Sequence, residues 1–230
     1  MKNKIYTLII AAALMTTAKA QQFNIKAGLN VYSMLVEFSD NTPFELKSTN
    51  LMGIHAGGSF DYFLNDQLSV EMGLLYMQKG YSGSDEFEID PILLPGTKGT
   101  VNFDFRLHYL DIPLQMKYRF GNRDVRFYVA AGPYIGIGLD GTIKFEAKSD
   151  FPGMEPEANE ESIKWGDDPN NDMLKRLEFG VCGGGGIEYN NFLLGINYAY
   201  GLNNISSSST EGTLKNRVFG ISLGYIINKQ

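Results

Sequence analysis

The sequence has little cysteine, little histidine and a shortage of basic residues, and each shortage excludes a class of protein. It contains one cysteine, Cys182, so no intramolecular disulfide can stabilise its 230 residues. Lys and Arg number 20 against 26 Asp and Glu, a net charge of −6. Nucleic-acid-binding proteins carry basic patches, so we expect no nucleic-acid partner. Two histidines and one cysteine are too few for a zinc site, and we expect no metal and no cofactor.

Long apolar runs are absent beyond the N-terminus, where a transmembrane helix would need roughly 18 residues. At the N-terminus, two lysines and an apolar run over residues 5–15 precede a small-x-small cleavage site at residues 18–20. We expect a cleaved secretory signal over 1–20, with an uncleaved anchor as the alternative, and one mature domain over 21–230. Removal of the signal takes away three lysines and leaves 17 basic against 26 acidic residues.

The sequence is instead rich in aromatic residues and glycine, with 13 Tyr, 15 Phe and 26 Gly. Apolar side chains recur at every second position in eight segments, which is typical of strands with one apolar and one polar face. The segments are 23–31, 52–64, 68–79, 101–120, 125–138, 176–189, 192–203 and 217–228.

The fourth of these segments contains a change of phase. Its apolar residues occupy odd positions up to Tyr109 and even positions from Leu110 onward. The change lies just before Pro113, and we interpret it as a β-bulge that keeps the apolar side chains on one face.

The connections alternate strictly in length. Short turns are expected at 65–67, 121–124 and 190–191, and long loops at 37–49, 80–99, 141–173 and 204–215. Aromatic residues also gather near the short turns or the C-terminus, as in an interfacial girdle: Phe60, Tyr62, Tyr118, Phe120, Tyr189, Phe192 and Tyr225. We predict an all-β fold: an eight-stranded antiparallel up-and-down transmembrane β-barrel with short periplasmic turns and long extracellular loops. A soluble β-sandwich or lipocalin-like barrel is the alternative.

Five stretches resemble the PorT-like outer-membrane β-barrel proteins of the Bacteroides group. They are Phe-Asn-Ile-Lys-Ala-Gly-Leu-Asn from Phe23, Gly-Leu-Leu-Tyr-Met-Gln-Lys-Gly-Tyr from Gly73, Tyr-Leu-Asp-Ile-Pro-Leu-Gln-Met-Lys-Tyr from Tyr109, Phe-Tyr-Val-Ala-Ala-Gly-Pro-Tyr from Phe127 and Gly-Gly-Ile-Glu-Tyr from Gly185. The resemblance covers the mature chain and implies a Gram-negative outer membrane, but it brings no catalytic residues. The chain departs from the pattern of outer-membrane barrels in lacking a terminal aromatic residue.

An eight-stranded barrel is just wide enough for side chains to fill its interior. Polar residues opposite the apolar faces should therefore form an internal network, because unpaired charges in a low-dielectric lumen are costly. The predicted members are Lys26, His55, Asp61, Glu71, Asp104, Arg106, His108, Lys117, Arg119, Arg176, Glu178, Glu188 and Arg217. A small-ion or proton path along this network is the functional alternative.

Catalysis and partner binding have weaker signals. A hydrolase would need a serine such as Ser59 within reach of His55 or His108, and the spacing does not support one. We predict no enzyme activity. The acidic loop over 148–172 is a candidate partner-docking loop, with Phe151, Met154, Trp165, Asp167 and Asp168 as contacts.

The sequence thus favours a structural or interaction barrel, either a membrane anchor or an accessory subunit of an envelope complex, in contact with outer-membrane lipids and other envelope proteins. A small-solute channel and a rim-located hydrolase are the alternatives. No ligand, partner or oligomeric state is readable from these residues.

Overall fold

The computed structural model describes residues 21–37, 47–88, 98–122, 124–149, 156–207 and 212–227, and this part of the chain is mostly β-strand. No helix in these ranges is long and apolar enough to cross a membrane. The strands are β1 (Gln21–Glu37), β2 (Lys47–Thr49), β3 (Leu51–Phe63), β4 (Leu68–Glu88), β5 (Lys98–Gly121), β6 (Val125–Ser149), β7 (Glu157–Ser162), β8 (Leu177–Tyr189), β9 (Phe192–Gly201) and β10 (Thr213–Ile226).

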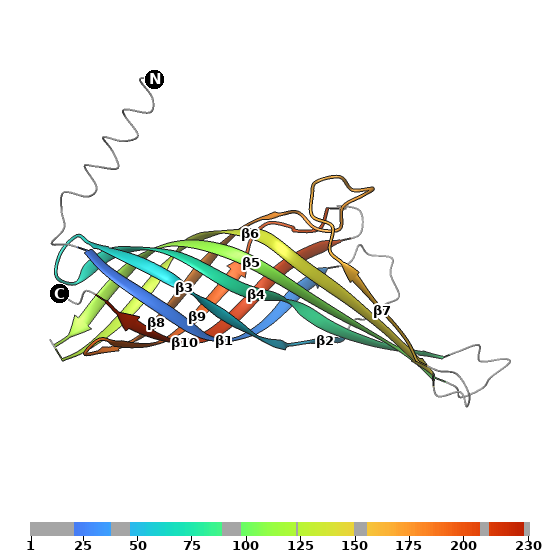
Figure 1. Cartoon of the computed structure of the whole chain (residues 1–230), viewed down its shortest axis with the longest axis horizontal. Helices are drawn as coiled ribbons and strands as arrows, with labels where there is room; N and C mark the ends of the chain where they lie inside the picture. Colours follow the sequence, from blue (N-terminus) through green and yellow to red (C-terminus); the bar gives the residue numbers. More distant parts are fainter. Residues whose placement is uncertain are drawn as a thin grey trace, which may run out of the picture.

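The strands form one antiparallel sheet that closes on itself (Figure 1). Neighbours run in the order β4-β3-β1-β10-β9-β8-β6-β5, and pairing between β4 and β5 completes the ring. Two short strands lie off the ring, where β2 pairs with β4 and β7 pairs with β6. The sequence predicts eight strands, and the described residues form ten, because β2 and β7 lie within regions predicted as long loops.

The connections within the ring differ at its two ends. Tight turns join β3 to β4, β5 to β6 and β8 to β9 at one end, as predicted. Asn65 Oδ1 accepts the backbone N–H of Gln67 and of Leu68, each at 2.9 Å, and Asn190 takes a φ of 51°. We call this the short-turn end and the opposite one the long-loop end.

Side chains alternate between the inside and the outside of the ring. The inward rows are buried and largely polar, whereas the outward rows expose large apolar side chains, with Phe192 65% and Leu223 68% exposed. Near the short-turn end the outward aromatic residues pack on one another, with ring centroids 5.7 Å apart for Phe120 and Phe127 and 5.6 Å apart for Phe192 and Tyr225. Lipid, rather than water, suits an apolar exterior of this extent.

The change of phase in the fourth segment of the sequence, 101–120, has a different cause from the β-bulge that we expected. In β5 the buried positions are odd on both sides of Tyr109, and the register with β4 is continuous through Tyr109. The register shift lies between β5 and β6, where His108 pairs with Asp140, Tyr109 pairs with Gly138, and Leu139 is the extra residue. The interpretation of a bulge that keeps apolar residues on one face of β5 was therefore wrong.

The apolar row of β5 instead moves from the outside of the sheet to the inside. Between Tyr109 and the short-turn end, the outward side chains of β5 include Ile112, Leu114 and Met116. Between Tyr109 and the long-loop end, the outward positions carry Asp104 and Arg106. The inward row changes in the opposite sense, from Asp111, Lys117 and Arg119 to Leu107, Phe105 and Phe103. This inversion is what a strand needs when it passes from lipid into water, because apolar side chains face lipid in a membrane but face inward in water.

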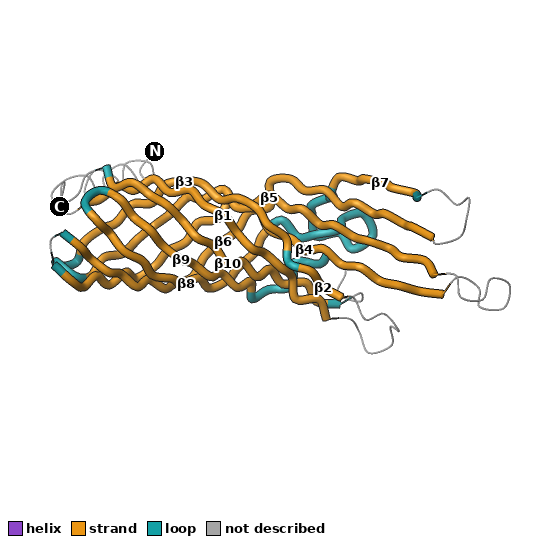
Figure 2. Tube along the Cα trace, turned by 90° about the horizontal axis from the view of Figure 1, so that it is seen from below, coloured by secondary structure: helices purple, strands orange, loops and turns teal. Residues whose placement is uncertain are grey.

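Beyond the inversion, β4, β5 and β6 continue as a sheet that projects past the ring, with β7 on its edge (Figure 2). We call this part, residues 80–88, 98–108, 140–149 and 157–162, the sheet extension. Its inner face carries Tyr81, Phe105, Phe103 and Phe145, with ring centroids 5.0 Å apart for Tyr81 and Phe105. Its outer face carries charged residues.

Candidate functional site

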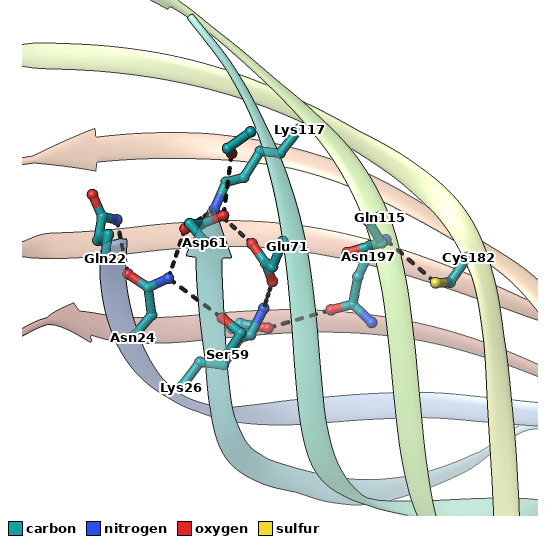
Figure 3. Close-up of polar contacts among 12 residues, drawn as sticks. Gln22, Asn24, Lys26, Ser59, Asp61, Glu71, Gln115, Lys117, Cys182 and Asn197 are labelled. Atoms are coloured by element: carbon teal, nitrogen blue, oxygen red, sulfur yellow. Dashed lines mark hydrogen bonds and ion pairs between the residues drawn. The ribbon is translucent and has the colours of Figure 1, made fainter. Parts of the chain in front are cut away.

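Charged side chains from six strands of the ring meet inside it near the short-turn end. Figure 3 shows four of them, Lys26, Asp61, Glu71 and Lys117. Lys117 Nζ lies 2.7 Å from Glu71 Oε2, and Arg119 bridges Asp61 Oδ2 at 2.7 Å and Glu188 Oε1 at 2.9 Å. We call this group the short-turn cluster. Its members are the acids Asp61, Glu71 and Glu188 and the bases Lys26, Lys117, Arg119 and Arg126.

The short-turn cluster is a filled, cross-linked cross-section of the ring. Lys117, Asp61 and Glu188 have fully buried side chains, and Arg119 also donates to Ser69 Oγ at 2.6 Å and stacks over the Phe63 ring. Four bases face three acids, so each carboxylate has a cationic partner. Charges buried in this way persist only when paired and hydrogen-bonded, and removal of one partner is costly. The cluster therefore holds the strands together and obstructs the lumen.

A second ionic group lies nearer the long-loop end, and we call it the long-loop cluster. Lys79 Nζ lies 2.9 Å from Asp111 Oδ1 and 2.7 Å from Glu178 Oε2, and all three side chains are 5% exposed or less. The Lys79 ammonium also lies over the rings of Tyr109 and Tyr134, 4.6 and 4.7 Å from their centroids. Here one cation serves two carboxylates.

A polar chain with the order of a nucleophile, a base and an orienting amide lies between the clusters. His55 Nε2 is 2.7 Å from Ser222 Oγ, and His55 Nδ1 is 2.6 Å from Asn30 Oδ1. Asn30 Oδ1 can only accept, so His55 Nδ1 carries a proton and donates it to this oxygen. The chain fits because Gly28 has no side chain: a Cβ there would lie 2.6 Å from His55 Cε1.

The surroundings of this chain do not resemble an active site. Ser222 is 6% exposed and His55 2%, and both border an internal cavity of about 70 Å³. That volume holds a few water molecules. A substrate would have to pass the short-turn cluster or the closed mouth described next. The chain is a satisfied buried polar network of the kind that folded proteins require.

The mouth of the ring at the long-loop end is closed by apolar side chains from the connections. Ile163, Leu174 and Ile205 are buried, and they belong to the same packed cluster as the inward-facing Leu107 and Tyr109. Their backbones are fixed by N–H···O bonds, such as that from Ile163 to Gly141 at 2.8 Å. Each such side chain contributes about 1.5–3 kcal/mol by burial. We call these three residues, with Trp165, the mouth plug.

The predicted internal residues divide between the two faces. Eight of them lie inside the ring at the levels just described: Lys26, His55, Asp61, Glu71, Lys117, Arg119, Glu178 and Glu188. Lys79, Asp111 and Arg126 were not among the predicted residues. Lys79 and Asp111 belong to the long-loop cluster with Glu178, and Arg126 pairs with Glu188 at 3.3 Å.

Three predicted internal residues of β5 lie on the outer row instead. Asp104 and Arg106 form a pair on the outer face of the sheet extension, with nitrogen and oxygen 3.9 Å apart. His108 stacks on Tyr76, and the tyrosine hydroxyl hydrogen-bonds its Nδ1. All three were misplaced because the apolar row of β5 changes faces above Tyr109.

Two predicted internal arginines are also misplaced. Arg176 is exposed just before β8 and donates to the Gly138 carbonyl at 3.1 Å. Arg217 has the same parity in β10 as the outward Phe219, and its guanidinium lies over the Tyr200 ring, 5.5 Å from the centroid. Both arginines lie toward the long-loop end of the ring, and neither belongs to the short-turn cluster or the long-loop cluster.

The predicted docking loop is partly strand and partly plug. Phe151 and Met154 lie outside the described residues. The Trp165 ring packs edge-on against Tyr109 at 5.6 Å, so it faces the mouth of the ring and is not a surface anchor. Asp167 and Asp168 are exposed in a turn, where hydrogen bonds from the Asn170 N–H and the Asn171 side chain lower the pKa of Asp168. Among the described residues, no three His, Cys, Asp or Glu side chains are grouped to hold a metal.

Comparisons with known proteins place this geometry in context. Residues 17–207 match the family model described as "Outer membrane protein beta-barrel domain". No curated protein matches the sequence. Similar solved structures include OprG from Pseudomonas aeruginosa (16% identity, 91% of this chain and 97% of that chain, TM-score 0.44). Ail, the attachment invasion locus protein of Yersinia pestis, is similar at 16% identity over 90% of this chain and 99% of that chain, with a TM-score of 0.40.

Proposed function

The chain belongs to the outer membrane protein beta-barrel domain family, so it is an outer-membrane β-barrel protein, and we propose that residues 21–230 form an eight-stranded up-and-down transmembrane barrel. Residues 1–20 direct export and are removed. The short turns face the periplasm and the sheet extension stands at the cell surface. The motifs from Tyr109 and Phe127 support placing the chain in the PorT-like group.

We propose a structural and interaction role: the barrel is a filled anchor that presents the sheet extension to another envelope protein. The observation that carries this proposal is the combination of a closed lumen and a projecting sheet. The short-turn cluster, the long-loop cluster and the mouth plug follow one another along the lumen. Three of the ring strands nevertheless extend past the membrane boundary, which a simple pore does not require.

The structure offers less support for the two alternatives. A channel needs a continuous aqueous path, and paired charges and packed apolar side chains lie across the lumen. A hydrolase needs an accessible nucleophile, and Ser222 is enclosed. We therefore assign no catalytic role to Ser222, His55 or Asn30.

The proposed role is tested by capture of partners from outer membranes. The tagged full-length protein is extracted in mild detergent beside a variant in which residues 83–103 and 145–159 are each replaced by Asn-Gly, which shortens the sheet extension at paired positions. Asn191→Gly alters a turn at the opposite end and serves as the control. We expect a stoichiometric envelope protein with the full chain and with Asn191→Gly, and its loss with the shortened variant. A protein that is captured equally by all three, or by none, contradicts the proposal.

A further inference from the structure

The sheet extension ends in an exposed strand edge at β7. This strand pairs with β6, and within the described part of the chain no strand pairs with its other edge. All six of its residues are exposed. In an antiparallel ladder the bonds to one neighbour use alternate residues, so about three residues of β7 direct their N–H and C=O groups to the free side. Natural proteins usually protect such an edge, because it accepts another strand.

The charges of β7 differ between its two faces. Glu160 lies on the outer face, and its carboxylate is 2.8 Å from Lys144 Nζ of β6. Glu157 and Glu161 lie on the inner face, four residues apart, and within the described ranges neither has an ion pair. The inner face of β7 therefore presents two carboxylates without a paired cation, and the outer face presents one carboxylate that is paired with Lys144.

The inner face of β7 adjoins the aromatic surface of the sheet extension. The register places Asn159, which lies between the two glutamates, beside Phe145 of β6. Phe145 makes an edge-to-face contact with Phe103, with ring centroids 5.2 Å apart, and both rings are half-buried. A strand added beyond β7 would thus continue a surface that is apolar at its centre and acidic on both sides.

We propose that the free edge of β7 binds an extended, basic segment of another protein, which joins the sheet as a further strand. Its inward row carries Lys or Arg opposite Glu157 and Glu161 and an apolar residue opposite Asn159, directed toward Phe145. Backbone bonds to β7 supply affinity and the two basic residues supply selectivity, as in other strand-addition complexes. A second copy of this chain does not fit, because its own β7 would add three more glutamates. The inference rests on the proposed interaction role and specifies the partner.

The probe is a synthetic peptide, acetyl-Thr-Lys-Thr-Val-Thr-Lys-Thr-amide, which reads the same in both directions and so suits parallel or antiparallel addition. The peptide with Glu in place of Lys is its control. Hydrogen exchange of the full chain in detergent is followed by mass spectrometry with up to millimolar peptide. We expect slower exchange within residues 157–162 with the Lys peptide and no change with the Glu peptide.

Matched variants distinguish recognition of the two inner-face glutamates from a general attraction of the basic peptide to acidic residues. Glu157→Gln with Glu161→Gln should weaken binding roughly 2- to 30-fold, the combined effect of two cross-strand charge pairs. Glu160→Gln removes the same charge from a carboxylate that Lys144 already neutralises, and binding should stay within about twofold. All three positions are exposed, so the fold should be unaffected.

Two results would overturn the inference. One is unchanged exchange in β7 at saturating Lys peptide. The other is weakening by Glu160→Gln as large as that by the double variant. Either result leaves the proposed role standing if the full chain still captures a partner through its sheet extension, whereas loss of that capture would refute the role itself.

Discussion

The long-loop cluster gives the sharpest stability prediction, because one lysine serves two buried carboxylates. Replacement of Lys79 by methionine keeps a long unbranched side chain but removes the ammonium group. Within the described residues, no other cation forms an ion pair with Asp111 or Glu178. Removing one partner of a buried ion pair costs about 3–5 kcal/mol. The lost contacts with two tyrosine rings add about 0.5–2 kcal/mol each.

Two further variants test the physical reason for this cost. Lys98→Met removes an exposed lysine 3.7 Å from Glu86, and should cost at most about 1 kcal/mol. The triple variant Lys79→Met, Asp111→Asn, Glu178→Gln removes both orphaned charges. It should recover to within about 2 kcal/mol of the wild type, since neutral replacements of buried ion pairs are often tolerated.

Unfolding by urea in lipid vesicles measures these differences. The fluorescence of Trp165, the one tryptophan of the sequence, reports the transition, because its ring packs on Tyr109 beside Lys79. A loss below about 1 kcal/mol for Lys79→Met, or a triple variant as unstable as the single one, would refute this account of the cluster.

Three other predictions concern the mouth plug and the polar chain. A Cβ at Gly138 would lie 2.4 Å from the Trp165 ring, so Gly138→Ala should displace the ring and shift its emission to longer wavelength; Gly183→Ala, whose nearest atom is 3.2 Å away, should leave it unchanged. Gly28→Ala should destabilise the protein by more than 1 kcal/mol in urea titration, because the new methyl meets Ile221 O at 1.9 Å; Gly58→Ala, with 3.3 Å, is its control. A fluorophosphonate should label no serine of the folded protein, and mass-spectrometric labelling at Ser222 would show an accessible nucleophile instead.

The parts of the fold that follow from local pattern were predictable from the sequence. Period-2 alternation located the strands of the ring, and Asn65 and Asn190 marked short turns that the structure contains. The strand ends were not predictable, since β4 to Glu88 and β6 to Ser149 continue into regions rich in polar and glycine residues. The six residues of β7 carry no apolar alternation, and pairing with β6 makes them a strand.

The residues inside the ring were predictable only where the outward side chains of the strands are apolar. Asp61, Glu71 and Arg119 share a face because they oppose lipid-facing residues. Above Tyr109 the same rule fails, because water replaces lipid outside the sheet and polar residues such as Arg106 turn outward. The phase change in the sequence was a sign of this boundary. The Ser222–His55 contact, by contrast, joins residues 167 positions apart and depends on the closure of the ring, which alternation does not reveal.

We propose that this barrel acts through its surface, because its lumen is closed. The direct test is the ionic current through the purified full-length protein in a planar lipid bilayer, with Lys79→Met and Arg119→Met recorded beside it. We predict no steady conductance from the wild type, because paired charges and the mouth plug fill the lumen. A stable ohmic conductance from the wild type, altered by either substitution, would show a continuous path through the lumen and contradict the account.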